Sequence, residues 1–206
     1  MKKLFLYVFL GLLISINVSY SGEKKIKSAF GIELDKNLQD YIDVMKDWNA
    51  DFCKREVASF KDQDLALIPI CIELTEPPIK NKLFSKYSIR FTPMSEFIWR
   101  IYASGVRKNR EECENDLDYL KEELSAQYYS SKKVEYWNFG YIKGFTIFQI
   151  PYKILVGCGD FDDKYDYDLH ISYENSDFEN MHYKEEQTLL EAIKSQKNKD
   201  KDKSGL

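Results

Sequence analysis

The first 21 residues decide in which compartment the rest of this chain folds. Two lysines follow the initial Met, and residues 4–18 form an uncharged, mostly apolar stretch. Residues 19–21 then place serines at the two positions that a signal peptidase reads. A basic head, an apolar middle and a small-residue exit are typical of a secretory signal peptide. The stretch is shorter than the roughly 20 apolar residues of a spanning helix, so we expect residues 1–21 to be cleaved and a periplasmic or secreted product.

The cysteines then constrain how an exported chain folds. Four follow the signal segment, and they are Cys53, Cys71, Cys113 and Cys158. An even number in an exported chain favours disulfides, although four cysteines allow three pairings. We prefer Cys53–Cys71 and Cys113–Cys158, because each bond then joins neighbouring segments. No two cysteines form a C-x-x-C motif, which argues against a zinc or redox site, and we expect no cofactor.

Length and charge narrow the class of protein further. The chain has the length of one domain with a real core. Its formal net charge is −4, and removal of the two signal lysines makes it more acidic. An acidic protein lacks the electrostatic footprint of a nucleic-acid binder, and no later apolar run is long enough for a stable membrane anchor. We expect a flexible lead-in at 22–29, a single domain at 30–195 and a disordered charged tail at 196–206.

Helical periodicity appears in three places. Apolar residues at helical spacing predict a helix over 37–60 that Asp35 caps. The clearest helix spans 110–128, where Asn109 can cap and Glu112 can bond back to it. Its apolar stripe begins at Cys113 and faces a sheet. A third helix is expected over 178–195.

Strand patterns fill the rest of the chain. Alternating or branched apolar runs bounded by Pro, Gly and Ser predict strands at 67–74, 84–91, 97–104, 134–139, 141–149, 152–157 and 167–173. In the strand at 97–104 we expect Trp99 and Ile101 on one face and Ile98 and Arg100 on the other. This order of elements predicts an α+β domain, with an antiparallel sheet and helices packed on one of its faces.

Short motifs resemble a group of exported bacterial proteins whose activity is uncharacterised. The start Ala29-Phe30-Gly31-Ile32-Glu33-Leu34 (AFGIxL) after a signal peptide resembles theirs. So does the later order of a helix that opens at Cys113 and a strand that ends in Cys158. The resemblance implies a periplasmic setting and the Cys113–Cys158 pair. It implies no activity and no catalytic residues.

Acidic residues and a histidine that could carry chemistry lie close together in the sequence, near the last predicted strand. Asp160, Asp162 and Asp163 precede a polar cluster of Asp166, Asp168 and His170. The carboxylates lack the spacing of a calcium loop, and two histidines are too few for a His-based metal site. His170 could pair with Asp166 or Asp168 as a general base, but no G-x-S-x-G nucleophile elbow accompanies it. We expect a solvated acidic surface and a His170 that is not catalytic.

Two classes of function remain open. Aromatic residues crowd 128–148, and an exposed aromatic strip could bind a sugar, a peptide or a protein. We therefore expect a non-enzymatic binding or interaction domain, with an unknown protein or small-molecule ligand. The alternative is a small periplasmic hydrolase with a site of unfamiliar form.

The signal segment gives a direct test. Mass spectrometry of the exported protein should find Gly22, or a residue within a few positions of it, at the N-terminus. Recovery of intact Met1 from the membrane fraction would instead identify residues 1–21 as an anchor.

Overall fold

Two four-stranded meanders make one antiparallel sheet. The structure, a computed structural model, describes residues 25–59, 62–128, 133–159 and 167–204. The first meander is β3 (Ala50–Ser59), β4 (Asp62–Leu74), β5 (Lys86–Phe91) and β6 (Ile98–Arg107), followed by α2 (Arg110–Gln127). The second is β7 (Lys133–Phe139), β8 (Ile142–Gln149), β9 (Tyr152–Gly159) and β10 (Tyr167–Asn175), followed by α3 (Ser176–Ser204). The sheet order is β3-β4-β5-β6-β10-β9-β8-β7, so β6 and β10 pair at the centre and β3 and β7 are the edges.

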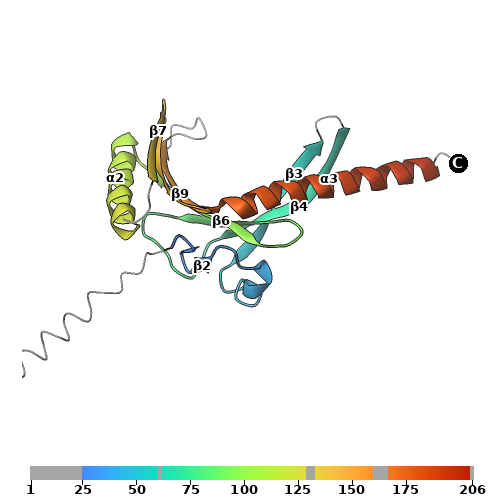
Figure 1. Cartoon of the computed structure of the whole chain (residues 1–206), viewed down its shortest axis with the longest axis horizontal. Coiled ribbons are helices and arrows are strands. Elements are labelled where there is room, and N and C mark those ends of the chain that lie inside the picture. The colour runs from blue at the N-terminus through green and yellow to red at the C-terminus, as the bar shows by residue number, and fades with distance from the viewer. Residues whose placement is uncertain (1–24, 60–61, 129–132, 160–166, 205–206) are drawn as a thin grey trace, which may run out of the picture.

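The sheet is strongly curved and its convex face carries the main core. Figure 1 shows β7 and β9 rising at one end and β3 and β4 at the other, with α2 and β2 outside the bend. The short strands β1 (Ser28–Ala29) and β2 (Ile32–Glu33) pair with each other beneath this face. Alternate strand residues point to it and are buried with the helix and the N-terminal segment; they include Ile72, Ile89, Ile101, Ala103, Phe145, Ile147, Ile154, Val156, Leu169 and Ile171.

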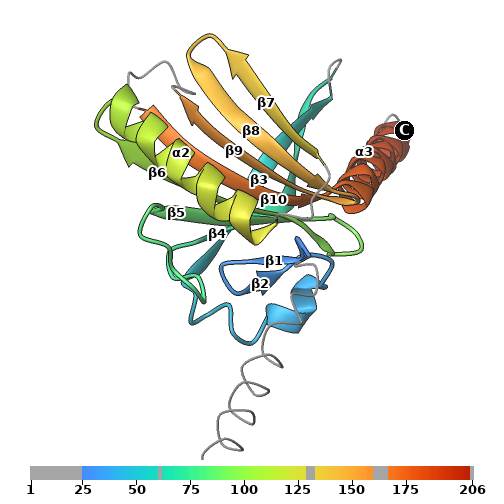
Figure 2. The ribbon, with the colours of Figure 1, turned by 60° about the vertical axis from the view of Figure 1, so that its left-hand side comes forward.

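Helix α2 confirms the sequence prediction closely. Asn109 Oδ1 accepts from the backbone N–H of Glu112 at 2.9 Å, the bond of an N-cap residue. The carboxylate of Glu112 reaches back one residue further than expected and accepts from the N–H of Lys108 at 3.0 Å. The predicted stripe is buried on the convex face, as Figure 2 shows for the helix, and consists of Cys113, Leu117, Leu120 and Leu124.

Helix α3 contacts the opposite face of the sheet. Its residues Leu189, Leu190 and Ile193 pack beside Cys71 in a cluster separate from the main core. Phe178 in its first turn lies against Phe97, with 4.9 Å between ring centroids. The expected α+β class and a large antiparallel sheet are therefore observed, but the two helices contact different faces of that sheet. Within the described residues, no helix is long and apolar enough to cross a membrane.

A β-bulge in β6 corrects the expected facing of two residues. Arg90 pairs with Arg100, whereas Phe91 pairs with Ile98, so Trp99 is an extra residue in β6. An extra residue changes the alternation on either side of it. As a result Ile98 joins Ile101 in the main core, and Trp99 lies outside that core cluster.

The predicted helix over 37–60 is wrong beyond its first turn. Asn37, not Asp35, caps a 3-10 helix at Leu38–Tyr41, and turns continue to Trp48. Asn49 then has φ 48°, which ends the turns, and β3 begins. Part of the predicted apolar stripe is nevertheless buried, because Met45 and Trp48 pack on the domain from these turns. From residue 50 onward, pairing of β3 with β4 overrides local helix propensity.

Residues 25–29, expected as part of a flexible lead-in at 22–29, belong to the domain, whereas residues 22–24 and the predicted signal peptide at 1–21 lie outside the described residues. Ile26 is fully buried, and its N–H donates to Gln149 Oε1 at 2.6 Å. Asp35, expected as a helix cap, instead accepts hydrogen bonds from Tyr152 Oη and from Asn175 Nδ2. These contacts hold the residues from 25 onward against β8, β9 and β10. Burial of the Ile26 side chain adds a favourable hydrophobic free energy that a solvated segment would lack.

The tail is also corrected. Residues 196–204, expected to be disordered, continue α3 to Ser204. The helix meets no Pro, and Gly205 comes just after its last residue. Lys, Gln and Asp are compatible with a helix that is already nucleated by α3's packed first half.

The cysteines join the segments that the sequence analysis preferred. Cys53 bonds Cys71 between neighbouring strands, with 5.2 Å between Cα atoms. Cys113 bonds Cys158 between α2 and β9, with 5.8 Å between Cα atoms. The second bond fixes the start of the helix to the convex face. Disulfides of this kind indicate an oxidising compartment.

The α2–β9 disulfide should contribute strongly to stability. Its cysteines are 45 residues apart, and closing such a loop stabilises a fold by about 4 kcal/mol in the chain-entropy model. Cys113→Ser should lower the melting temperature markedly, and the Cys113→Ser/Cys158→Ser pair should cost little more. Non-reducing peptide mapping measures the bond directly. A fragment that joins Cys113 to Cys53 or Cys71 would contradict this topology.

Candidate functional site

A row of side chains crosses the concave face from β7 to β6. Trp137 lies opposite Gly144, and Gly144 lies opposite Gly157. Gly157 in turn lies opposite His170, and His170 lies opposite Ser104. Neighbours of these residues along the strands, such as Phe145 and Val156, belong to the convex core. The row therefore faces the inside of the bend.

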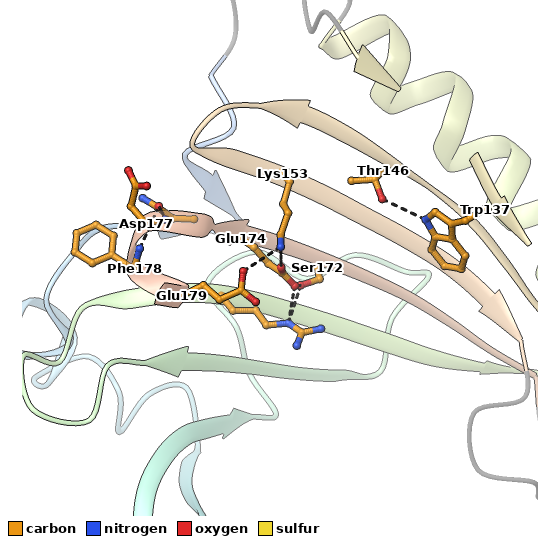
Figure 3. Close-up of polar contacts among 10 residues, drawn as sticks. Trp137, Thr146, Lys153, Ser172, Glu174, Asp177, Phe178 and Glu179 are labelled. Atoms are coloured by element: carbon orange, nitrogen blue, oxygen red, sulfur yellow. Dashed lines mark hydrogen bonds and ion pairs between the residues drawn. The ribbon is translucent and has the colours of Figure 1, made fainter. Parts of the chain in front are cut away.

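The two glycines form a seat for the Trp137 ring. A Cβ added at Gly144 would lie 2.4 Å from the ring and 2.1 Å from the carbonyl oxygen of Val156. A Cβ at Gly157 would lie 2.7 Å from the same ring and 2.4 Å from His170 Cε1. Glycine inside a strand costs stability and often marks a close approach. Here it allows the indole to lie against the sheet, and the indole N–H donates to Thr146 Oγ1 at 3.2 Å (Figure 3).

His170 continues this aromatic surface. Its ring stacks on Tyr102 with 6.2 Å between centroids and 22° between planes. The guanidinium of Arg100 lies 5.4 Å from the Tyr102 ring centroid, within cation–π range. Burial, and then the charge of Arg100, lower the pKa of His170 from 6.5 to about 4. The imidazole is therefore neutral at physiological pH, and it can donate from one nitrogen and accept at the other.

A compact charge cluster borders the row. Glu174 Oε1 lies 3.0 Å from Arg100 Nε and accepts from Ser172 Oγ at 2.6 Å. Its other oxygen lies 2.9 Å from Lys153 Nζ, which also contacts Glu179 of α3 at 3.0 Å. Figure 3 shows Lys153 between the two carboxylates. Burial alone would raise the pKa of Glu174, but Arg100, Ser172 and Lys153 lower it. Glu174 is thus kept as a carboxylate by its two cationic neighbours and the Ser172 hydroxyl group.

The expected polar cluster is only partly inside the described structure. Asp166, like Asp160, Asp162 and Asp163, lies outside the described residues. Asp168 is half-buried on β10, two residues before His170 and opposite Val106. Burial raises the pKa of Tyr102, and the charge of Asp168 adds to that rise, so Asp168 belongs to the same surroundings. Within the described chain, no group of three or more His, Cys, Asp or Glu side chains could hold a metal ion.

The second histidine lies apart from this face's aromatic row. His182 on α3 is buried, and its Nδ1 lies 3.1 Å from the carbonyl oxygen of Phe91. Its ring lies 5.2 Å from that of Trp99, and its Nε2 lies 3.8 Å from Glu186. These contacts attach α3 to β5 and β6, which is a structural role.

The aromatic residues of 128–148 were expected from the sequence, but not which of them lies in the seat formed by Gly144 and Gly157. Tyr128 and Phe145 are buried packing residues, whereas Tyr136, Phe139 and Tyr141 are exposed. Only the sheet register shows that Trp137 lies over two glycines of other strands. Two glycines inside neighbouring predicted strands were the signal that could have indicated a close approach.

Comparison of the chain with protein-family models, with curated proteins and with solved structures found no match in any of the three.

The arrangement offers aromatic faces on which a ligand can stack. It combines the faces of Trp137, His170 and Tyr102. The hydroxyl groups of Thr146 and Ser172 are buried and support this surface from within, through their bonds to Trp137 and Glu174. The cysteines are bonded, so they supply no thiolate among the described residues. A base with a pKa of about 4 accepts a proton weakly at neutral pH.

The depressed pKa of His170 predicts how stability depends on pH. The unfolded histidine binds a proton below about 6.5, whereas the folded one stays neutral to about 4. The free energy of unfolding should therefore fall as the pH falls through this window, by roughly 3 kcal/mol for this group. His170→Phe keeps a ring and removes the titration. Denaturant unfolding at several pH values should show that the difference between the two proteins disappears, or reverses in favour of the variant, near pH 4. Parallel curves for the two proteins would contradict the burial of a neutral imidazole.

Proposed function

We propose that this chain is an exported, non-enzymatic binding domain, periplasmic or secreted, whose concave sheet face holds the ligand. The two disulfides support an oxidising compartment. The basic, apolar and small-residue order of residues 1–21 supports cleavage of a signal peptide. The function itself depends on the concave face.

The Trp137 seat is the observation that carries the proposal. Its ring is half-buried, lies against Gly144 and Gly157, and has its N–H bonded to Thr146. Such a ring is fixed in place, so a ligand that stacks on it loses little side-chain entropy of the protein. Next to it, His170 and Tyr102 extend the aromatic surface. A rigid aromatic platform beside polar groups is the usual composition of a small-molecule site.

The charges around the platform favour an uncharged ligand. Arg100 and Lys153 are the cations of the bordering cluster, and Glu174 and Glu179 neutralise them. The neutral imidazole of His170 offers hydrogen-bonding nitrogens without adding a charge. A ligand made of rings, each with one apolar face and hydroxyl groups on its edge, would match this surface. The ligand class that fits best is a neutral glycan.

The hydrolase considered from the sequence has weaker support. His170 is a poor base because burial and Arg100 lower its pKa to about 4. Of the two acids predicted to pair with it, Asp166 is outside the described residues, and Asp168 lies two residues before it on β10.

Titration with neutral oligosaccharides tests the proposed function. Trp48 and Trp99 are buried, whereas Trp137 is half-buried, so the indole N–H signal of Trp137 should report binding. We expect chitotetraose or maltotetraose at millimolar concentration to shift this signal and those of His170 and Tyr102. Trp137→Ala should weaken binding about tenfold or more, the equivalent of 1.4 kcal/mol.

Tyr141→Ala is the matched control. Tyr141 is an aromatic residue of the same hairpin, but it is 77% exposed in the turn, and its loss should leave the affinity unchanged. The proposal is wrong if neither sugar shifts the concave-face signals, or if the shifts occur in α2 instead.

A further inference from the structure

The edge strand β7 is unusually apolar and exposed for its position. It ends the sheet, and no described strand pairs along its outer side. Val134, Tyr136 and Phe139 are 36%, 64% and 75% exposed. Natural proteins protect such edges with Pro, bulges or unpaired charges. In β7 the register has no bulge, and Lys133 and Glu135 neutralise each other. The edge is thus open to a further strand.

The hairpin geometry shows which backbone groups face outward. Gly140, with φ 71°, begins a two-residue turn between β7 and β8. Such a turn makes Phe139 and Ile142 a hydrogen-bonded pair, and bonded and non-bonded pairs alternate from there. The backbone groups of Val134, Tyr136 and Asn138 therefore point away from β8. All three residues are exposed.

A recess beside this edge can receive a side chain from an added strand. It has a volume of about 210 Å³ and lies between α2 and the β7–β8 hairpin. Leu117, Tyr136 and Phe145 give it apolar walls, and Asn138 and Lys121 stand at its polar side. Lys121 Nζ lies 4.9 Å from the Tyr136 ring centroid and holds that ring at the recess. An added strand gains main-chain bonds from the edge and a side-chain contact from the recess.

We propose that the outer edge of β7 pairs with β7 of a second copy of this chain. A two-fold axis at Tyr136 places the two strands antiparallel, with Val134 opposite Asn138 of the second copy. Each Val134 then reaches the other copy's recess, which Asn138 lines. A contact of this kind uses the same patch on both subunits and closes after two copies.

The charges of β7 agree with this pairing. Lys133 comes opposite Phe139 of the second copy, and Glu135 comes opposite Trp137, so no like charges face each other directly. The two Glu135 side chains are diagonal neighbours, and each is neutralised by the Lys133 of its own chain. On the axis, Tyr136 lies opposite Tyr136 of the second copy, which adds an aromatic contact.

Hydrogen exchange on the mature, oxidised protein tests the pairing residue by residue. At high protein concentration the amides of Val134, Tyr136 and Asn138 should be protected, and dilution should release them. The amides of Glu135 and Trp137 bond β8 and should stay protected at every concentration. Exchange that does not depend on concentration would overturn the proposal, and so would protection that only an added extended peptide produces.

Sedimentation equilibrium with three variants completes the test. Tyr136→Pro removes an outward N–H without removing a bond to β8, and Tyr136→Lys places a charge on the axis while leaving the backbone intact. Both should weaken the dimer at least tenfold with an unchanged circular dichroism spectrum. Tyr141→Lys, an equal change at the exposed turn, should dimerise like the parent. A monomeric parent protein, or a Tyr136→Lys variant that dimerises like the parent, would refute the second copy as occupant.

Discussion

The ladder between β6 and β10 is the contact on which the rest of the fold depends. It joins two meanders that would otherwise be separate four-stranded sheets. Its eight pairs run from Tyr167 opposite Arg107 to Glu174 opposite Arg100 without a register shift. A slip by one residue would turn every side chain of one strand to the other face. If β10 slipped, Ile171 would leave the core and Glu174 would enter it, so both faces select the same register.

The concave face of the sheet is polar, yet its charged side chains are held in place by their partners. An antiparallel sheet needs only one apolar face, and here α2 and the N-terminal segment cover the convex one. On the other face, Glu174 is almost fully buried yet has two cationic neighbours and a hydroxyl donor. A buried ion pair adds little net stability, but loss of one partner typically costs about 3–5 kcal/mol. The cluster therefore specifies how β6, β9, β10 and α3 meet, because any other arrangement leaves a charge unpaired.

Local signals predicted those parts of the fold that depend on local interactions. The cap at Asn109 and the stripe from Cys113 to Leu124 define α2 without tertiary help. The prediction of a helix over 37–60 was wrong because turns that pack on a core also bury residues at helical spacing, as Met45 and Trp48 show. The predicted facing of Ile98 and Trp99 was wrong because a bulge can be recognised only from the register with the partner strand. Strand pairing and registers are non-local, and sequence periodicity does not contain them.

The candidate site was harder to predict for the same reason. His170 and Asp168 could be placed on one strand by alternation, and they share the environment of Tyr102. Trp137, Gly144 and Gly157 are members of the site only because three strands align them. Periodicity identified the aromatic residues but not which of them meets a glycine of the next strand.

Strand β7 shows how one element can serve two surfaces. Successive side chains point to opposite faces, so the ring of Trp137 lies against Gly144 and Gly157 while its neighbours Tyr136 and Asn138 point toward α2. All three residues of β7 line the recess by α2. The backbone groups of those same neighbours face the open edge, whereas those of Trp137 bond β8. An added strand would therefore pair with residues that leave the Trp137 seat in place. It would also hold β7 in its position at the edge of the sheet, and the indole depends on that position to meet Gly144 and Gly157. The edge contact and the concave site are thus joined through the backbone of β7 and through Trp137, which lines the recess and belongs to the concave row.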